Sequence, residues 1–153
     1  MRTTLFAAIL FSLFAFTSER KISIVEKPED AILGDWMTVK NNLKVRVTKE
    51  NGQYKATILW FNEVGYKCKM NECTDENNPD PALRNRKIIG LQVLSGLKYD
   101  AQDKYWKGGE IYDSNSGHTY DSAVRMPSQN VLDVRGFYLF EWLGQTLNFY
   151  RVK

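Results

Sequence analysis

Hydrophobic and polar residues alternate along most of the chain from residue 34 onward. The clearest alternation covers residues 43–48 and continues over residues 54–60, with the dipeptide Asn51-Gly52 between the two runs. A strand with one buried face places every second side chain in the core, so this pattern predicts two β-strands. Asn-Gly between alternating runs is typical of a tight hairpin turn, and we therefore expect the two strands to pair.

The same pattern predicts further strands joined mostly by short turns. They cover residues 34–40, 88–97, 106–113, 118–126, 131–138 and 146–152. Residues 62–86 are rich in Asn, Asp, Glu and Pro, which predicts a long loop. Pro28, followed by two acidic residues, suits the first turn of a helix, so the lead-in over residues 19–32 is expected to contain one short helical turn. Residues 138–143 allow a second.

Eight sequential strands with short connections favour an antiparallel meander. Eight is also the number at which such a sheet can close on itself, and closure removes the exposed edges of an open sheet. We therefore predict an all-β fold over residues 33–153, an eight-stranded antiparallel up-and-down barrel, rather than a two-sheet sandwich. In a closed barrel the first and last strands are neighbours, which would place the guanidinium of Arg151 over the ring of Trp36.

The first eighteen residues have the pattern of a secretory signal peptide. Arg2 precedes an apolar run over residues 5–16, and small polar residues follow at Thr17 and Ser18. The run is shorter than the roughly 20 residues that span a bilayer, so a membrane anchor is the less favoured interpretation. We expect an exported protein, periplasmic or secreted, with no membrane span.

The charge of the chain bears on whether it binds nucleic acid, and its two cysteines bear on whether it contains a disulfide. The net charge of the chain is only +3, and its basic residues are scattered among acids, which argues against a nucleic-acid partner. Cys68 and Cys73 both lie in the exported part, where a disulfide is the simplest interpretation. A redox pair is less favoured, because four residues separate the two cysteines where redox motifs have two.

The mature chain carries six short motifs, which are Asn78-Pro79-Asp80-Pro81-Ala82-Leu83-Arg84, Ile89-Gly90-Leu91, Gly108-Gly109-Glu110-Ile111-Tyr112-Asp113, Asn115-Ser116-Gly117-His118-Thr119-Tyr120, Val134-Arg135-Gly136-Phe137 and Gly144-Gln145-Thr146. Taken together, these motifs resemble a bacterial family known as domain of unknown function 2147. Gly34-x-Trp36 with the terminal Arg151 is similar to the signature of lipocalin and calycin folds. The resemblance implies an exported bacterial protein with a small lipocalin-like or streptavidin-like barrel and no established activity.

This chain departs from the family pattern at three positions. Ser114 stands where the family often has proline, and Phe149 stands where a tryptophan is common. His118 stands where lysine is frequent, which argues against a general catalytic role for this histidine.

Candidate catalytic and metal-binding groups are few. His118 is the only histidine, and its neighbours within one hairpin rarely form a triad. Asp113, Asn115 and the acidic segment 75–80 carry oxygen ligands of the kind that calcium prefers, but the same residues are typical of turns. Glu110 faces inward if Trp106 and Tyr112 do, and outward if Ile111 faces inward. We expect no metal and no cofactor.

The pattern as a whole favours a non-enzymatic barrel that binds a small apolar or amphipathic molecule. Residues 62–86 would shape its opening, and we expect a monomer. An alternative is a solid-cored structural or interaction protein of the cell envelope, with an exposed apolar patch near Phe140 and Trp142. A hydrolase using Glu110 or His118 is less favoured. The expected ligand-binding residues are Tyr54, Trp60, Glu110, Tyr112 and Tyr120.

Overall fold

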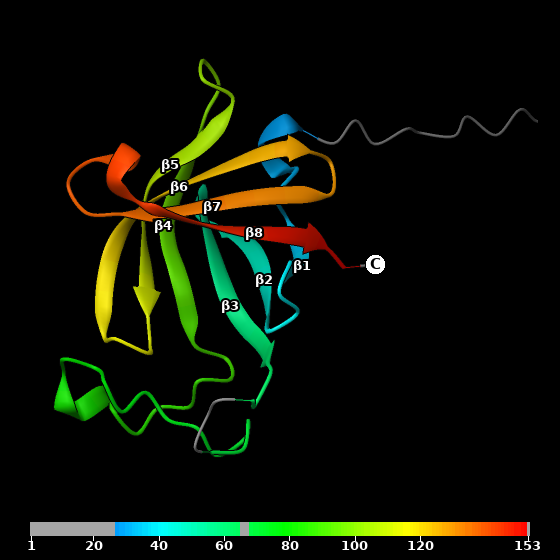
Figure 1. Cartoon of the computed structure of the whole chain (residues 1–153). Helices are drawn as coiled ribbons and strands as arrows, with labels where there is room; N and C mark the ends of the chain where they lie inside the picture. The colour runs from blue at the N-terminus through cyan, green and yellow to red at the C-terminus, as the bar shows by residue number, and fades with distance from the viewer. Residues whose placement is uncertain (1–26, 65–67, 153) are drawn as a thin grey trace, which may run out of the picture.

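The chain forms a closed eight-stranded barrel in a computed structural model that describes residues 27–64 and 68–152 (Figure 1). The predicted signal peptide lies outside the described residues. All neighbouring strands are antiparallel and follow the order of the chain. The strands are β1 Gly34–Thr38, β2 Leu43–Glu50, β3 Gln53–Phe61, β4 Gln92–Asp100, β5 Tyr105–Asp113, β6 His118–Ser128, β7 Val131–Phe137 and β8 Gln145–Arg151.

Three short 3-10 helices lie between or before the strands: η1 Pro28–Asp30, η2 Pro81–Leu83 and η3 Glu141–Leu143. The expected helical turn before the barrel is confirmed as η1, and the second short helix is η3. Among the described residues, no helix is long and apolar enough to cross a membrane.

Pairing between β1 and β8 closes the barrel. Trp36 lies opposite Arg151, and the guanidinium carbon of Arg151 lies 4.2 Å from the centre of the Trp36 ring. Arg151 also donates hydrogen bonds to the carbonyl oxygens of Ala31 and Leu33, at 2.5 and 2.8 Å. The predicted fold and the predicted cation–π pair are therefore both confirmed.

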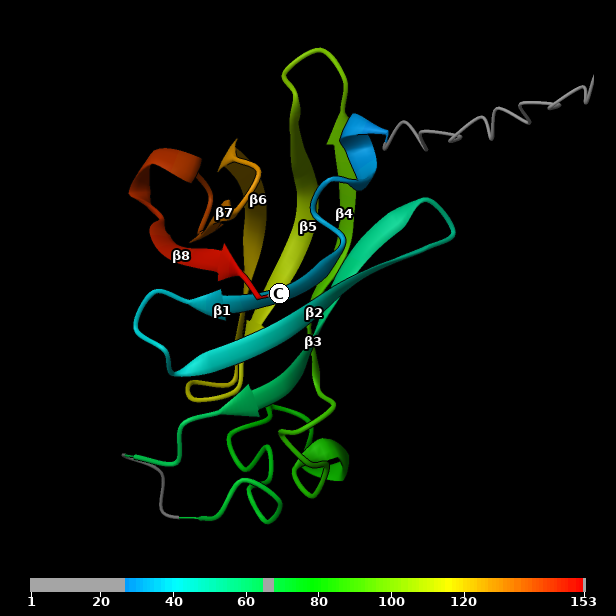
Figure 2. The same ribbon diagram turned by 90° about the vertical axis from the view of Figure 1, so that its right-hand side faces the viewer.

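The barrel has a closed end and an open end. At the closed end lie η1 and the β2–β3, β4–β5 and β6–β7 turns; at the open end lie the other four connections, including the long β3–β4 loop (Figures 1 and 2). Two indole N–H groups anchor the segment around η1: Trp106 donates to the carbonyl of Glu29 at 3.0 Å, and Trp36 to that of Ile32 at 2.8 Å. These bonds satisfy carbonyl groups that a short helix leaves without partners.

A bulge in β5 decides which way Glu110 points. The register of β5 against β6 shifts between Trp106 and Gly109, where Gly108 adopts a φ of 72°. A bulge adds one residue to a strand and reverses the alternation of faces beyond it. Both Trp106 and Ile111 therefore contribute to the core, and Glu110 is exposed on the outside.

A second bulge changes the end of β3. Its register against β2 shifts between Lys44 and Val45, so that Ile58 and Phe61 both face the interior. Trp60 lies opposite Lys44 on the outer face. The prediction that Trp60 lines the interior is therefore wrong, because simple alternation does not anticipate the extra residue.

The fourth strand begins later than predicted. Residues 88–91 form a turn, with the N–H of Leu91 donating to the carbonyl of Ile88 at 3.1 Å. Ile88 and Leu91 are nevertheless buried against the core, and this burial gives the segment its strand-like apolar composition. The other seven strands begin and end close to the predicted positions.

Candidate functional site

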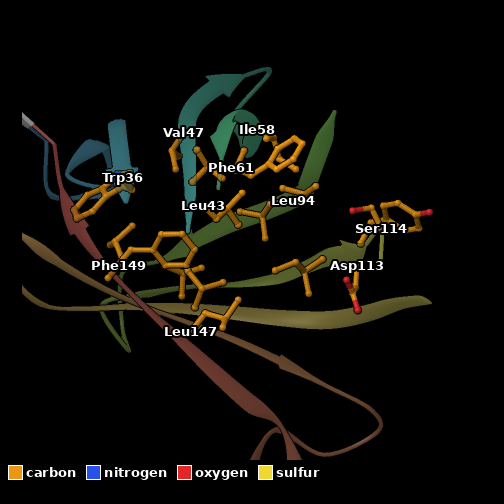
Figure 3. Close-up of a pocket in the computed structure, with 18 of the residues that line it drawn as sticks. Trp36, Leu43, Val47, Ile58, Phe61, Leu94, Asp113, Ser114, Leu147 and Phe149 are labelled. Carbon is orange, nitrogen blue, oxygen red and sulfur yellow. The ribbon is translucent and has the colours of Figure 1, made fainter. Parts of the chain in front are cut away.

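The interior of the barrel contains a cavity of about 210 Å³ (Figure 3). It extends from Trp36, near the closed end, to the β5–β6 turn at the open end. Most of its wall is hydrocarbon, because the inward positions of the strands carry apolar residues. Those labelled in Figure 3 are Trp36, Leu43, Val47, Ile58, Phe61, Leu94, Leu147 and Phe149.

Polar groups border the cavity mainly where it meets the β5–β6 turn. The carboxylate of Asp113 accepts hydrogen bonds from the backbone N–H of Asn115, at 3.0 Å, and from the hydroxyl of Ser116, at 2.7 Å. These oxygens therefore stabilise the turn itself. Within residues 27–64 and 68–152, no group of three or more His, Cys, Asp or Glu side chains is arranged to hold a metal ion.

A buried carboxylate anchors the β3–β4 loop to the barrel. The side chain of Asp75 is fully buried and accepts hydrogen bonds from the hydroxyl of Tyr112 at 2.7 Å and from the amide of Asn78 at 2.7 Å. Arg86 forms an ion pair with the same carboxylate, with N···O distances of 2.8 Å. Since Tyr112 belongs to β5, this cluster fixes the loop against the strand that borders the cavity.

The predicted disulfide between Cys68 and Cys73 is present in the same loop. Cys73 is buried, and its carbonyl accepts a hydrogen bond from the N–H of Ile88 at 3.1 Å. The disulfide therefore lies close to the point where the loop joins the core.

The expected ligand-binding residues are dispersed. Tyr54 is buried at the closed end, where its hydroxyl donates to Asp30 at 2.9 Å and its ring meets Trp106 edge-on at 6.3 Å. Burial raises the pKa of Tyr54 above its ordinary value. Tyr54 thus packs with η1 and Trp106 at the closed end. Trp60 and Glu110 are on the outside of the barrel.

Tyr112 and Tyr120 lie at the open end. Tyr112 borders the cavity, but its hydroxyl is directed to Asp75 in the loop, and its pKa is raised by burial and then by this carboxylate. Tyr120 is half-buried at the opening, with its ring 6.0 Å from that of Tyr138. Tyr112 alone of the five expected residues borders the cavity.

The residues that do line the cavity are mostly aliphatic, with Phe61 and Phe149 among them. Their alternation was visible in the sequence, but our expectation favoured tyrosine and tryptophan because the chain is rich in aromatic residues. The aliphatic positions are identified once the two bulges are placed.

The two candidate catalytic groups are not brought together. Glu110 lies opposite Asp121 and His118 lies opposite Asp113, in a regular section of the β5–β6 pairing. Successive side chains of a strand point to opposite faces, so Glu110 and His118 are on different faces of the hairpin. Both side chains are exposed.

Comparison with known proteins places the chain in a family. The profile of a family described as uncharacterised proteins conserved in bacteria (DUF2147) matches residues 34–151. The protein belongs to this family. No curated protein matches it significantly.

A solved structure with the same architecture comes from the human pathogen Helicobacter pylori. That protein, HP1028, is described as belonging to the lipocalin family. It is 27% identical to this chain, the match covers 80% of this chain and 83% of HP1028, and the TM-score is 0.66. The similarity supports a lipocalin-like barrel across most of the chain.

Proposed function

We propose that this protein holds one small apolar or amphipathic molecule inside its barrel. The observation that carries the proposal is the cavity of about 210 Å³, whose wall is mostly hydrocarbon. Binding sites for small molecules are typically concave and apolar, with a few polar groups that orient the ligand. The likeness to a lipocalin supports the same function.

Cavity size limits the ligand. An apolar cavity of roughly 150 Å³ accommodates benzene, so the larger volume here corresponds to about eight carbon atoms. A medium-length alkyl chain or a single ring with a short substituent fits this space. The polar groups near Asp113 lie where the cavity meets the open end, which favours a ligand with its apolar part inside and a polar group at the opening.

Calorimetric titration with saturated fatty acids of increasing chain length tests the proposal. Val134 lines the cavity from β7, and Val134→Phe would fill part of it. Loss of room for two methylene groups lowers affinity by about tenfold or more, at roughly 0.8 kcal/mol for each group. Val131→Phe is the matched control, because Val131 precedes the buried Leu132 and faces outward on the same strand.

A second variant enlarges the cavity. Leu147 lines the cavity but is 46% exposed, so Leu147→Ala should leave the protein folded and shift the preferred fatty acid to a longer chain. If no fatty acid binds the wild-type protein, or if Val134→Phe and Val131→Phe behave alike, the interior is not the binding site.

Export is a second part of the proposal and rests on the leader-like residues 1–18. Native mass spectrometry of the protein purified from the bacterial envelope tests both parts in one measurement. The expected result is a chain that begins near residue 19 and carries a bound small molecule. Recovery of the full-length chain from the cytosol would refute the export prediction.

The alternative of a structural or interaction protein assumed a solid interior, and the cavity weighs against that assumption. Its second expectation was an exposed aromatic patch near Phe140 and Trp142, and both side chains are exposed.

A further inference from the structure

The connection between β7 and β8 exposes an unusual set of large apolar side chains. Leu139 and Trp142 are 79% and 75% exposed, and Phe140 and Trp142 stack with their ring centres 6.1 Å apart. Tyr138 and Leu143 are exposed as well. This loop projects from the barrel at the left of Figure 1. Contiguous exposed apolar patches on a soluble domain usually mark a site of interaction.

Apolar surface continues from this loop onto neighbouring segments. Leu147, on β8, is 46% exposed and also lines the cavity. Val39 lies beside β8, since its N–H donates to the carbonyl of Asn148 at 3.0 Å, and its side chain is exposed. The turns at the closed end consist only of polar residues, glycine and one alanine.

Two arginines, one on β6 and one on β7, attach the loop to the barrel. Arg135 donates hydrogen bonds to the carbonyls of Glu141 and Trp142, the latter at 3.1 Å. Arg125 forms an ion pair with Glu141, the only acidic residue of the loop. The loop is therefore fixed on the barrel with its apolar side chains outward.

We propose that the open end of the barrel docks on the surface of a lipid bilayer through residues 138–143. Tryptophan and tyrosine have an apolar body and a polar group, and they are enriched at the boundary between lipid headgroups and acyl chains. Glu141 is paired with Arg125, and Glu110 and Asp121 border the groove beside Tyr138 and Leu139, so the apolar and aromatic side chains of the loop, and not its charge, favour a lipid surface.

A second copy of the chain is a poorer match to this surface. Stable protein interfaces bury about 800 Å² on each partner and involve some 20–30 residues a side. The six loop residues, even together with Leu147 and Val39, are far fewer than this, whereas insertion into a lipid interface needs only a few apolar side chains.

Docking at this position would also serve the proposed ligand site. Tyr138 and Leu143 border a groove that also includes Asp113, and Asp113 lines the cavity as well. An amphipathic ligand could therefore pass between bilayer and barrel along this groove. Docking itself rests on the exposed loop and does not require that the cavity hold a ligand.

Vesicle flotation tests the docking surface. The wild-type protein is expected to float with vesicles of phosphatidylethanolamine and phosphatidylglycerol and with vesicles of phosphatidylcholine. Leu139→Glu combined with Trp142→Glu should reduce partitioning by about tenfold or more, because two large side chains no longer enter the lipid. Both positions are exposed, so thermal unfolding should change little.

The control variant, Gln102→Glu with Gln129→Glu, adds the same charge at exposed positions of the closed end and should partition like the wild type. Fatty-acid titration of each variant in solution measures the ligand site separately. The docking proposal is refuted if the wild type floats with neither vesicle, or if both double variants lose binding equally. If the protein instead forms a dimer without lipid, and the loop substitutions dissociate this dimer, the surface binds a second copy of the chain.

Discussion

Replacing Asp75 by alanine should destabilise the protein more than any other change to an acidic residue of the β3–β4 loop. The substitution removes a fully buried carboxylate and leaves Tyr112, Asn78 and Arg86 without their shared acceptor. Breaking a buried ion pair from one side costs about 3–5 kcal/mol. Arg86 is 36% exposed and can be rehydrated, so we expect about 3 kcal/mol, the lower end of that range.

Urea unfolding followed by circular dichroism measures this change in the free energy of unfolding. Asp80→Ala is the matched control in the same loop. The Asp80 side chain is exposed and accepts only the N–H of Ala82 at the start of η2, so its loss should cost about 1 kcal/mol. Amide hydrogen exchange shows whether the loop opens locally before the barrel unfolds.

A second, independent signal comes from Tyr112. Its pKa is raised by burial first and by the Asp75 carboxylate next. Asp75→Asn removes the charge and keeps the shape, so the pKa of Tyr112 should fall but remain above its ordinary value. Ultraviolet titration against the Tyr112→Phe variant isolates this residue.

One contradicting result would be that Asp75→Ala and Asp80→Ala destabilise the protein equally while amide exchange in the loop is unchanged. Another would be a pKa of Tyr112 that is the same with Asp75 and with asparagine at that position. Either result would mean that the carboxylate does not anchor the loop.

Three further changes test the barrel itself. Arg151→Lys should lower the free energy of unfolding by about 2 kcal/mol in urea, because lysine keeps the charge over Trp36 but loses the bonds to two backbone carbonyls. Gly109→Ala should lower the free energy of unfolding by about 1–3 kcal/mol, since a Cβ there would lie 2.7 Å from the Leu97 side chain. An unchanged midpoint of urea unfolding would contradict the packing of β4 on β5. The hydrogen bond from Lys49 lowers the pKa of Asp30, so the ionised Asp30 stabilises the fold at any pH above the ordinary pKa of an aspartate. This stabilisation should be lost as the pH falls below about 4. The thermal midpoint of the wild type, compared with that of Asp30→Asn across this pH range, measures the loss.

Sequence periodicity was a reliable guide to the strands and a poor guide to the site. The strand count, the Asn51-Gly52 hairpin, the disulfide and the Trp36–Arg151 pair are all present in the structure. The expected site residues were placed less well, because the bulges in β3 and β5 reverse which residues face inward. Two adjacent glycines at 108 and 109 are a visible signal for one bulge, whereas the β3 bulge has no comparable mark.

The acidic loop gives another example of this limit. Asp75 is one of several acids in residues 75–80, and its turn-forming neighbours predict that the whole segment is an exposed loop. Its burial depends on Arg86, eleven residues away, and on Tyr112, thirty-seven residues away. Contacts between such distant positions are set by how the loop folds back on the barrel.

The sequence by itself determined the closed barrel, because alternation and short turns leave antiparallel neighbours as the simplest pairing and Arg151 has a partner only when the ends meet. Tertiary structure decided between a hollow and a solid interior, and it decided where the exposed side chains of residues 138–143 lie relative to the opening of the barrel. Both depend on how side chains from many strands fill space, and no local pattern measures the volume they leave.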